Sequence, residues 1–461
     1  MRHTSLTTNC TRDMTKPPSG RERSIVALTL SLLGSIVTAQ SLPVSARAFA
    51  ITHYDVELRP QLDAHTVDGL VSLTVQVPDA GTSHVTLNRG VLEIDEVMEG
   101  GRPLTFQIDS ALLQIELPPG NDRRARTIAV RYHGRPTSGL VFAPEREQLY
   151  TIFSTPQWMP SVDDPGARAT VRLRLHVPRP WTGAASGRQI SRRPVSAGVD
   201  VVEWLQERPM PAYTFGFAVG RFSEVSDREL GVTLQYFADG FSPDEIRAIF
   251  GESRQILRFF EERSGVPYPW RTYAQALVAR TAGQEMAGLS LVSEEYGRAV
   301  LADRTAIGLL AHEFSHQWWG NMVTCHAWTE FWLNEGFATF MAAAYRERRF
   351  GRATYLADIS AMRTRYEQVV ARGNDRALVF PSWNRPSADD RTLVYQKGAL
   401  VLHDLRERVG DSNFWKGVRL YTRRNFGRSV TTEALRLAFE EASGVDLREF
   451  FAPIVGVDAK R

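Results

Sequence analysis

Cysteine is nearly absent from this sequence of 461 residues, which contains only Cys10 and Cys325. Two cysteines are too few for a disulfide-stapled scaffold or for a cysteine-based zinc site. An excess of charge of one sign is also lacking, because 55 basic residues oppose 52 acidic ones and the formal net charge is only +3. Lysine occurs only at positions 16, 397, 416 and 460, and the arginines are scattered. The composition therefore argues against a nucleic-acid partner and against an acidic membrane surface.

A long apolar run is missing as well, since a membrane-spanning helix takes about 20 apolar residues. The apolar run at residues 25–37 is shorter, follows Arg21 and Arg23, and resembles the core of a secretory signal peptide. Small residues before Gln40 suit a cleavage site. We therefore expect residues 1–39 to be a signal peptide, the protein to be exported to the periplasm or secreted, and no stable membrane span to remain after cleavage. An uncleaved anchor and an over-extended start of the sequence are the alternatives.

Residues 50–225 carry the pattern of β-strands. Apolar and polar residues alternate over several stretches, and turn signals such as Pro78-Asp79 and Glu99-Gly100-Gly101 separate them. Alternation with short turns is typical of antiparallel sheets that have one face in water. The expected strands include 53–58, 71–77, 112–117, 127–132 and 171–177.

Residues 240–455 carry a helical pattern instead. Ser242, Pro243 and Glu245 form a typical helix start, and apolar residues then recur at helical spacing as far as Phe260. The sequence therefore predicts an α+β fold, with an N-terminal antiparallel β-sheet domain at 50–225 and a mostly helical domain at 240–455. Further helices are expected at 303–319, 330–349, 397–409, 412–425 and 431–442, with a short strand at 273–279.

The strongest chemical signal is a His-Glu-Phe-Ser-His motif that contains His312, Glu313 and His316. On a helix, positions i and i+4 share a face, so both imidazoles can bind one zinc ion while the glutamate reaches a water molecule there. Catalytic zinc usually has three protein ligands and one open position. Glu335 lies among apolar residues, where a dication would compensate its charge. Glu330 is a rival ligand, although a helix start already favours a carboxylate at its position.

Residues 312–321 and 332–338, the latter reading Trp-Leu-Asn-Glu-Gly-Phe-Ala, resemble the gluzincin aminopeptidases of the aminopeptidase N and leukotriene A4 hydrolase type. Glu335 follows His316 by 19 positions, which is that family's spacing. The resemblance extends over most of residues 50–455. It implies a thermolysin-like catalytic domain with one zinc ion, held by His312, His316 and Glu335, and Glu313 as the general base.

The same resemblance implies roles for three further residues. Tyr395, within Val-Tyr-Gln-Lys-Gly, matches the family's catalytic tyrosine, and a phenol can donate a hydrogen bond to an oxyanion at neutral pH. Glu285 matches the glutamate that binds the free α-amino group of the substrate. Its neighbours Gln284 and Met286 depart from the family's Gly-Ala-Met-Glu-Asn segment. Gln157 aligns with a second amine-binding residue only if the loop after it is shortened.

We therefore expect a zinc-dependent aminopeptidase that acts on peptides with a free N-terminus. A zinc epoxide hydrolase is one alternative, because leukotriene A4 hydrolase also opens an epoxide. A non-enzymatic peptide-binding module is the other, although the complete set of site residues argues against it. Relatives usually carry a further C-terminal helical domain, and we expect that domain to be absent here. The sequence carries no indication of the oligomeric state.

Overall fold

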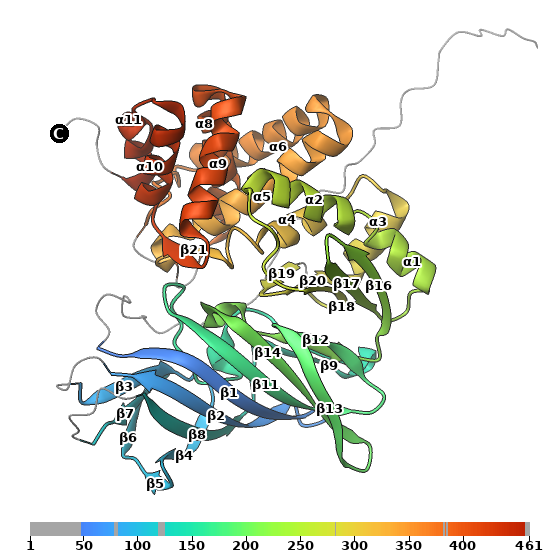
Figure 1. Ribbon diagram of the computed structural model, residues 1–461, viewed down its shortest axis with the longest axis vertical. Helices are drawn as coiled ribbons and strands as arrows, with labels where there is room; N and C mark the ends of the chain where they lie inside the picture. The colour runs from blue at the N-terminus through green and yellow to red at the C-terminus, as the bar shows by residue number, and fades with distance from the viewer. Residues whose placement is uncertain are drawn as a thin grey trace, which may run out of the picture. The chain divides into compact units, whose positions relative to one another are not determined.

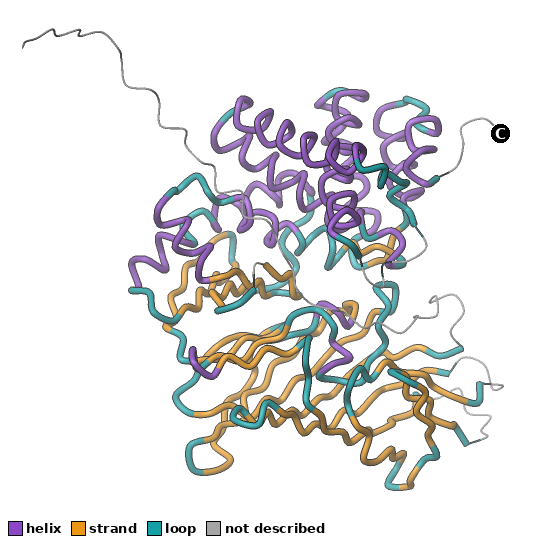
Figure 2. Tube along the Cα trace, turned by 180° about the vertical axis from the view of Figure 1, so that it is seen from behind, coloured by secondary structure: helices purple, strands orange, loops and turns teal. Residues whose placement is uncertain are grey.

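The computed structural model describes residues 48–77, 82–118, 125–281, 283–380, 383 and 386–456, all of which belong to one compact unit of the chain. The expected signal peptide at 1–39 and the turn at Pro78-Asp79 lie outside the described residues. Strands fill the N-terminal region and helices dominate the C-terminal region, as the blue-to-red colouring of Figure 1 and the purple helices of Figure 2 show. The predicted α+β fold is confirmed.

An eight-stranded sheet forms the base of the N-terminal region. Its neighbouring strands are antiparallel apart from β1 and β11, which run parallel with Tyr54 opposite Val171. Alternate side chains of β11 are buried, as the alternating sequence predicts. The turn at Gly100-Gly101 joins β4 to β5 with positive φ at both glycines, a conformation that glycine adopts without strain. The strand order is β13 (Arg188–Ser196), β14 (Val199–Pro211), β11 (Arg168–Pro178), β1 (Ala50–Gln61), β2 (Thr66–Gln76), β8 (Arg126–Gly134), β4 (Glu93–Glu99) and β5 (Arg102–Pro103).

Two smaller sheets complete the N-terminal region and share its hydrophobic core. Short 3-10 helices follow two of the strands: η3 (Thr155–Gln157) lies after β10, and η4 (Ala212–Thr214) lies after β14. These two turns bring Gln157 and Tyr213 into buried positions. One sheet has the order β12 (Thr182–Ala185), β15 (Phe217–Gly220), β10 (Gln148–Thr151) and β9 (Leu140–Ala143), and the other has the order β3 (His84–Asn88), β7 (Leu112–Glu116) and β6 (Phe106–Asp109). A third 3-10 helix is η2 (Pro144–Arg146).

A five-stranded sheet opens the helical region. Strands β17, β18 and β20 run parallel to one another, and β19 is an antiparallel edge strand that carries Gln284 and Glu285. The strand expected at 273–279 is confirmed as β18. Strands β16 and β17 pair with this sheet, although they lie around the gap between the two expected domains. The order is β16 (Ser223–Glu229), β17 (Val232–Ala238), β18 (Thr272–Val278), β20 (Leu289–Ser293) and β19 (Gly283–Met286).

Two of the expected helices differ in extent from the prediction. The helix predicted from Ser242 begins with the expected capping box, but it ends at Ile249 as α1 (Pro243–Ile249), and α2 (Ser253–Ser264) follows. Gly251, a poor helix former, lies between them. The helix expected at 303–319 is shorter and forms α4 (Gly308–Ser315). At its expected start, Asp303 closes a turn by accepting a hydrogen bond from the Thr305 amide.

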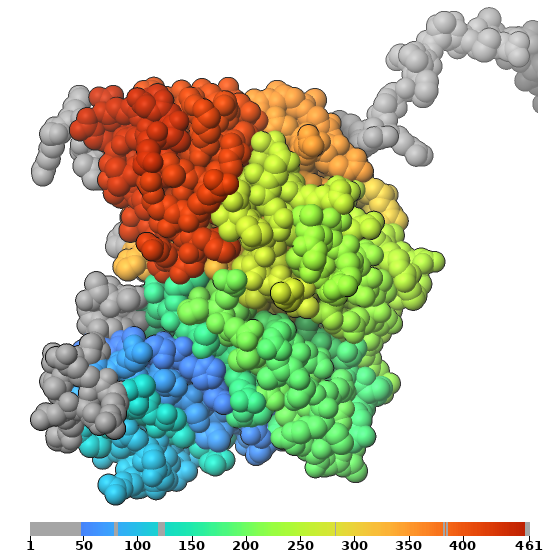
Figure 3. Space-filling view, in the orientation of Figure 1, coloured from blue at the N-terminus to red at the C-terminus, as the bar shows by residue number. Residues whose placement is uncertain are grey.

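One long helix was not expected from the sequence. In α6 (Arg352–Ala371) only Tyr355, Ile359 and Val369 are buried, so the helix lacks a continuous apolar face. The red C-terminal helices lie against the yellow-green segment that contains α2, where α2 and α9 are in contact (Figure 3). None of the described helices is both long and apolar enough to cross a membrane. The remaining elements are α3 (Glu294–Ala302), β21 (Val323–Cys325), η5 (Trp328–Glu330), α5 (Trp332–Phe350), α7 (Ala388–Thr392), η6 (Leu393–Lys397), α8 (Gly398–Val409), α9 (Asp411–Asn425), β22 (Arg428–Val430), α10 (Thr432–Ser443) and α11 (Arg448–Val455).

Candidate metal centre and active site

Helices α4 and α5 bring the three predicted zinc ligands together. His312 lies in the last turn of α4 and His316 directly follows that helix as its C-cap, and their Nε2 atoms lie 3.1 Å apart. Glu335, in the first turn of α5, places Oε2 at 3.3 Å from Nε2 of His312 and 3.5 Å from Nε2 of His316. All three side chains are buried. The three residues that the sequence motif indicated therefore form one compact group of potential metal ligands.

The chemistry of this trio fits a zinc ion. Two imidazole nitrogens and one carboxylate oxygen are a common catalytic zinc set. His316 Nδ1 lies 3.1 Å from the Trp319 carbonyl oxygen, which leaves Nε2 free to face the metal. Within the described part of the chain, Glu335 Oε2 is buried and accepts no hydrogen bond of good geometry. Burial alone would raise the pKa of Glu335, but the charge on His316 and the polar contacts with His312 and His316 lower it overall.

Glu313 belongs to a second group that shares His316. One donor atom each from Glu285, Glu313 and His316 lies within 4.8 Å of the other two. A Cβ atom on Gly283 would lie 2.1 Å from Oε1 of Glu313, so a larger residue at that position of β19 would displace the Glu313 carboxyl group. Burial raises the pKa of Glu313 well above its ordinary value, against the opposing effect of His316. Burial therefore disfavours the charged form of this side chain.

Tyr395 lies beside the first group of donors, on the π-helix η6. The wider turn of a π-helix is rare and is often found at functional sites. The phenol ring is stacked on the His312 imidazole, with ring centroids 5.9 Å apart and planes 8° from parallel. Desolvation and the nearby carboxylates of Glu335 and Glu285 raise the pKa of Tyr395 well above its ordinary value. The hydroxyl group therefore keeps its proton and can act as a donor.

A glycine contact sets the distance between Glu335 and Tyr395. A Cβ atom on Gly336, in α5, would lie 2.9 Å from Cα of Gly398, at the start of α8. Gly336 directly follows Glu335, and Gly398 lies three positions after Tyr395. The two backbones can approach this closely only because both positions lack a side chain.

Gln157 belongs to the N-terminal region, where it is the last residue of η3. Its side chain is buried in the N-terminal region, where Cβ atoms on Gly90 and Gly139 would each come within 2.8 Å of it. Its Oε1 accepts no hydrogen bond from any residue that the structure describes. The structure thus gives Gln157 no visible link to Glu285, and its role as an amine contact stays a prediction.

Glu330, the rival zinc ligand, and Cys325 contribute to the packing of the fold and not to the groups of potential metal ligands among the described residues. Oε1 of Glu330 accepts a hydrogen bond of 2.9 Å from the backbone amide of Thr432, the first residue of α10. This contact satisfies one of the free amides at the start of that helix. Cys325 is buried and free. Neither residue belongs to the two groups of potential ligands found in the described ranges.

Two residues of the N-terminal region support the site, and no sequence motif marks them. Tyr213 of η4 donates a hydrogen bond of 2.8 Å to the Gly320 carbonyl and accepts one of 3.0 Å from Asn334, the neighbour of Glu335. The Arg168 guanidinium donates to Thr324 Oγ1 at 2.8 Å and to the Asn321 carbonyl at 3.0 Å.

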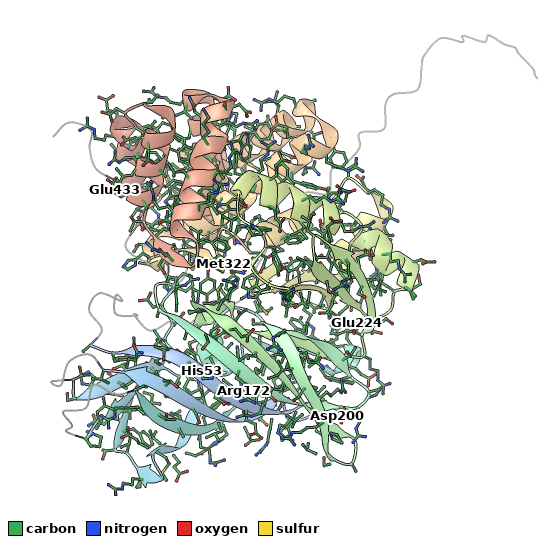
Figure 4. The ribbon with its side chains drawn as sticks, viewed as in Figure 1. His53, Arg172, Asp200, Glu224, Met322 and Glu433 are labelled. Atoms are coloured by element: carbon green, nitrogen blue, oxygen red, sulfur yellow. The ribbon has the colours of Figure 1, made fainter. Side chains whose placement is uncertain are left out.

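Both contacts hold the loop after α4 against the N-terminal sheets. Met322, from the same loop, packs into the N-terminal core (Figure 4). The orientation of α5, and with it Glu335, therefore depends partly on residues that lie more than 100 positions earlier in the chain.

Comparison with known proteins identifies both regions of the chain. The family model described as "Peptidase M1 N-terminal domain" matches residues 50–214, and the model described as "Peptidase family M1 domain" matches residues 249–453. Among curated relatives, aminopeptidase N of Streptomyces lividans is 29% identical over 80% of this chain and 44% of its own length. Aminopeptidase N of Caulobacter vibrioides is 27% identical over 84% of this chain and 48% of its own length. The chain spans about half the length of these relatives.

Solved structures match over nearly their whole length. The M1 zinc metallopeptidase from Deinococcus radiodurans is 25% identical, with a TM-score of 0.73, and the match covers 89% of this chain and 94% of that one. A two-domain M1 zinc metallopeptidase variant bound to L-tryptophan is 24% identical, with a TM-score of 0.75, over 91% of this chain and 97% of that one. An architecture of two domains thus has a close structural parallel.

Proposed function

Because the chain belongs to peptidase family M1, we propose that it is a zinc-dependent aminopeptidase that removes N-terminal residues from peptides. The observation that carries this proposal is that His316 belongs to both buried groups. The metal ligands on one side of His316 and the pair Glu285 and Glu313 on the other form one continuous cluster. Aminopeptidase names among the relatives and the zinc metallopeptidase structure support the same activity.

We propose that His312, His316 and Glu335 hold a single zinc ion. A bound zinc ion supplies Lewis-acid activation of the scissile carbonyl group and of the attacking water. The side chains around it then determine where protons and charges go.

Glu313 serves as the general base and afterwards as the general acid in this mechanism. Its Oε2 is buried and has no hydrogen-bond partner among the described residues, so it is available to an incoming water molecule. The carboxylate takes a proton from the attacking water and later transfers that proton to the nitrogen of the leaving amine.

Tyr395 and Glu285 bind the two ends of the first residue of the substrate, its carbonyl group and its α-amino group. The Tyr395 hydroxyl donates a hydrogen bond to the former carbonyl oxygen as negative charge develops there. The Glu285 carboxylate binds the α-ammonium group, and Oε1 is free to do so because no described residue donates to it. An ammonium held at a fixed distance from Glu313 limits cleavage to the first peptide bond.

Two peptides that differ only in acetylation of the N-terminus test this proposal. The zinc-loaded protein is expected to shorten the free peptide one residue at a time and to leave the acetylated peptide intact. A chelator should abolish the reaction, and added zinc should restore it. Mass spectrometry of the products gives the readout. Internal cleavage of both peptides would contradict an exopeptidase, and absence of cleavage in both would contradict the proposed activity.

We also propose that the protein is exported and that residues 1–39 are removed. The support is the basic and then apolar character of this segment and the small residues before Gln40. The protein purified from a secreting host is expected to begin at Gln40, as the mass of its N-terminal peptide would show. An intact N-terminus on membrane-associated protein would favour the uncleaved anchor instead.

A further inference from the structure

Gln284 connects the proposed amine anchor to a strained loop of the N-terminal region. Its Nε2 donates a hydrogen bond of 2.9 Å to Oε2 of Glu285, and its Oε1 accepts one of 2.9 Å from the backbone amide of Phe153. Phe153 and Ser154 both have positive φ, at 35° and 45°, which is uncommon for residues other than glycine. Gln284 is itself fully buried. One side chain therefore links residues about 130 positions apart.

From these contacts we propose that Gln284 is a positioning residue, which holds the Glu285 carboxylate ready for the α-amine of the substrate. The inference rests on the proposed function, because it assigns Gln284 a part in the same amine site. With Oε2 of Glu285 bonded to Gln284, Oε1 is the oxygen left without a partner among the described residues, and it is the one available to the substrate.

The chemistry of an amide suits this task. A buried carboxylate needs a hydrogen-bond donor, because an unpaired polar group in the interior is costly. An arginine or lysine in place of Gln284 would also donate, but it would neutralise the charge that attracts the ammonium group. The neutral amide satisfies one oxygen and leaves the negative charge for the substrate.

The second hydrogen bond of Gln284 fixes the direction of the first. An amide group is planar, with its donor and its acceptor on opposite sides of one carbon. Since Oε1 is held by the Phe153 amide, Nε2 is held toward Glu285. A methionine at this position, as in the family segment, would fill a similar volume and make neither contact.

A pair of zinc-binding ligands measures the amine site directly. Leucine hydroxamate and its des-amino analogue, 4-methylpentanehydroxamic acid, differ only in the α-amino group. The dissociation constants of both ligands are measured by calorimetry on the zinc-loaded full chain. Their ratio reports how much the amine contributes to binding, independently of turnover. The variants are Gln284→Met and Gln284→Leu, which both remove the two hydrogen bonds and introduce no charge.

The wild-type protein is expected to prefer the amine-bearing ligand, and both variants should lose about tenfold of that preference, as expected for one hydrogen bond to a charged group. Gln275→Met is the matched control. Gln275 lies on β18 of the same five-stranded sheet as Gln284, is also fully buried, and accepts a hydrogen bond from Ser253. This control is expected to lower the melting temperature and to keep the preference.

A purely structural role for Gln284 would reduce stability and leave the ratio unchanged, and that result would overturn the inference. If Gln284→Met does not fold, Gln284→Leu decides the question, because it also makes neither hydrogen bond and its side chain is shorter. A wild-type protein without any preference would instead refute the amine anchor at Glu285, and hence the proposed exopeptidase. The two failures are thus distinguishable.

Discussion

Replacement of Glu313 by glutamine is expected to lower kcat by at least about 100-fold and to leave zinc binding intact. Glutamine has nearly the same size and still forms hydrogen bonds, but its amide cannot carry a proton from water to the leaving amine. Glu313 is not one of the three donors grouped as His312, His316 and Glu335. Steady-state kinetics together with the zinc content of the purified variant check this expectation.

Glu330→Gln is the control for this substitution. Glu330 is a nearby carboxylate whose Oε1 accepts a hydrogen bond from the Thr432 amide, and glutamine can still accept that bond. The control should therefore retain wild-type turnover and zinc content. Near-wild-type turnover in Glu313→Gln would show that another group moves the proton.

Removal of the Tyr395 hydroxyl, in Tyr395→Phe, should lower kcat by about 10²–10³-fold, the usual effect of losing one oxyanion donor. The hydroxyl group acts mainly on the charge that develops during the reaction, so KM should change little. The stacking of the ring on His312 is preserved in phenylalanine, and zinc content should not change. The measurement is kcat and KM on the free peptide.

Tyr421→Phe provides the matched control for Tyr395. Tyr421 is a buried tyrosine of α9, and its hydroxyl has no hydrogen-bond partner among the described residues. Loss of that hydroxyl should leave both kcat and stability close to wild type. A fall in kcat of similar size in both variants would mean that phenol removal acts through the packing of the domain.

Local patterns explain why much of the fold could be predicted. The alternation of Val171, Leu173 and Leu175 predicts a strand because every second side chain of β11 is buried. The start of α1 follows from Ser242 and Glu245, whose reciprocal hydrogen bonds involve only neighbours in the sequence. The sequence does not predict α6, because that helix buries few side chains.

In the candidate site, too, contacts between neighbours in the sequence were predictable and contacts between distant segments were not. His312 and His316 are four positions apart on one helix, so their proximity follows from helix geometry alone. Glu335 is a candidate from its apolar neighbours, with Glu330 as a rival, and the resemblance to a known family decides between them. Tyr395 lies on another element and requires that resemblance. The support from Tyr213 and the two hydrogen bonds of Gln284 depend on the packing of distant segments. Gln284 departs from the family segment in which it lies, and nothing in the sequence around it or around Tyr213 predicts these contacts.

The contacts of Tyr213 and Arg168 with the loop after α4 also restrict how this protein can recombine with its relatives. A chimaera joined between residues 214 and 249, at the gap between the two family matches, would combine one parent's Tyr213 with the other parent's Asn334. Substitutions on the two sides of that junction are therefore coupled. The two matched segments must be inherited together, or exchanged with their contact residues as a set.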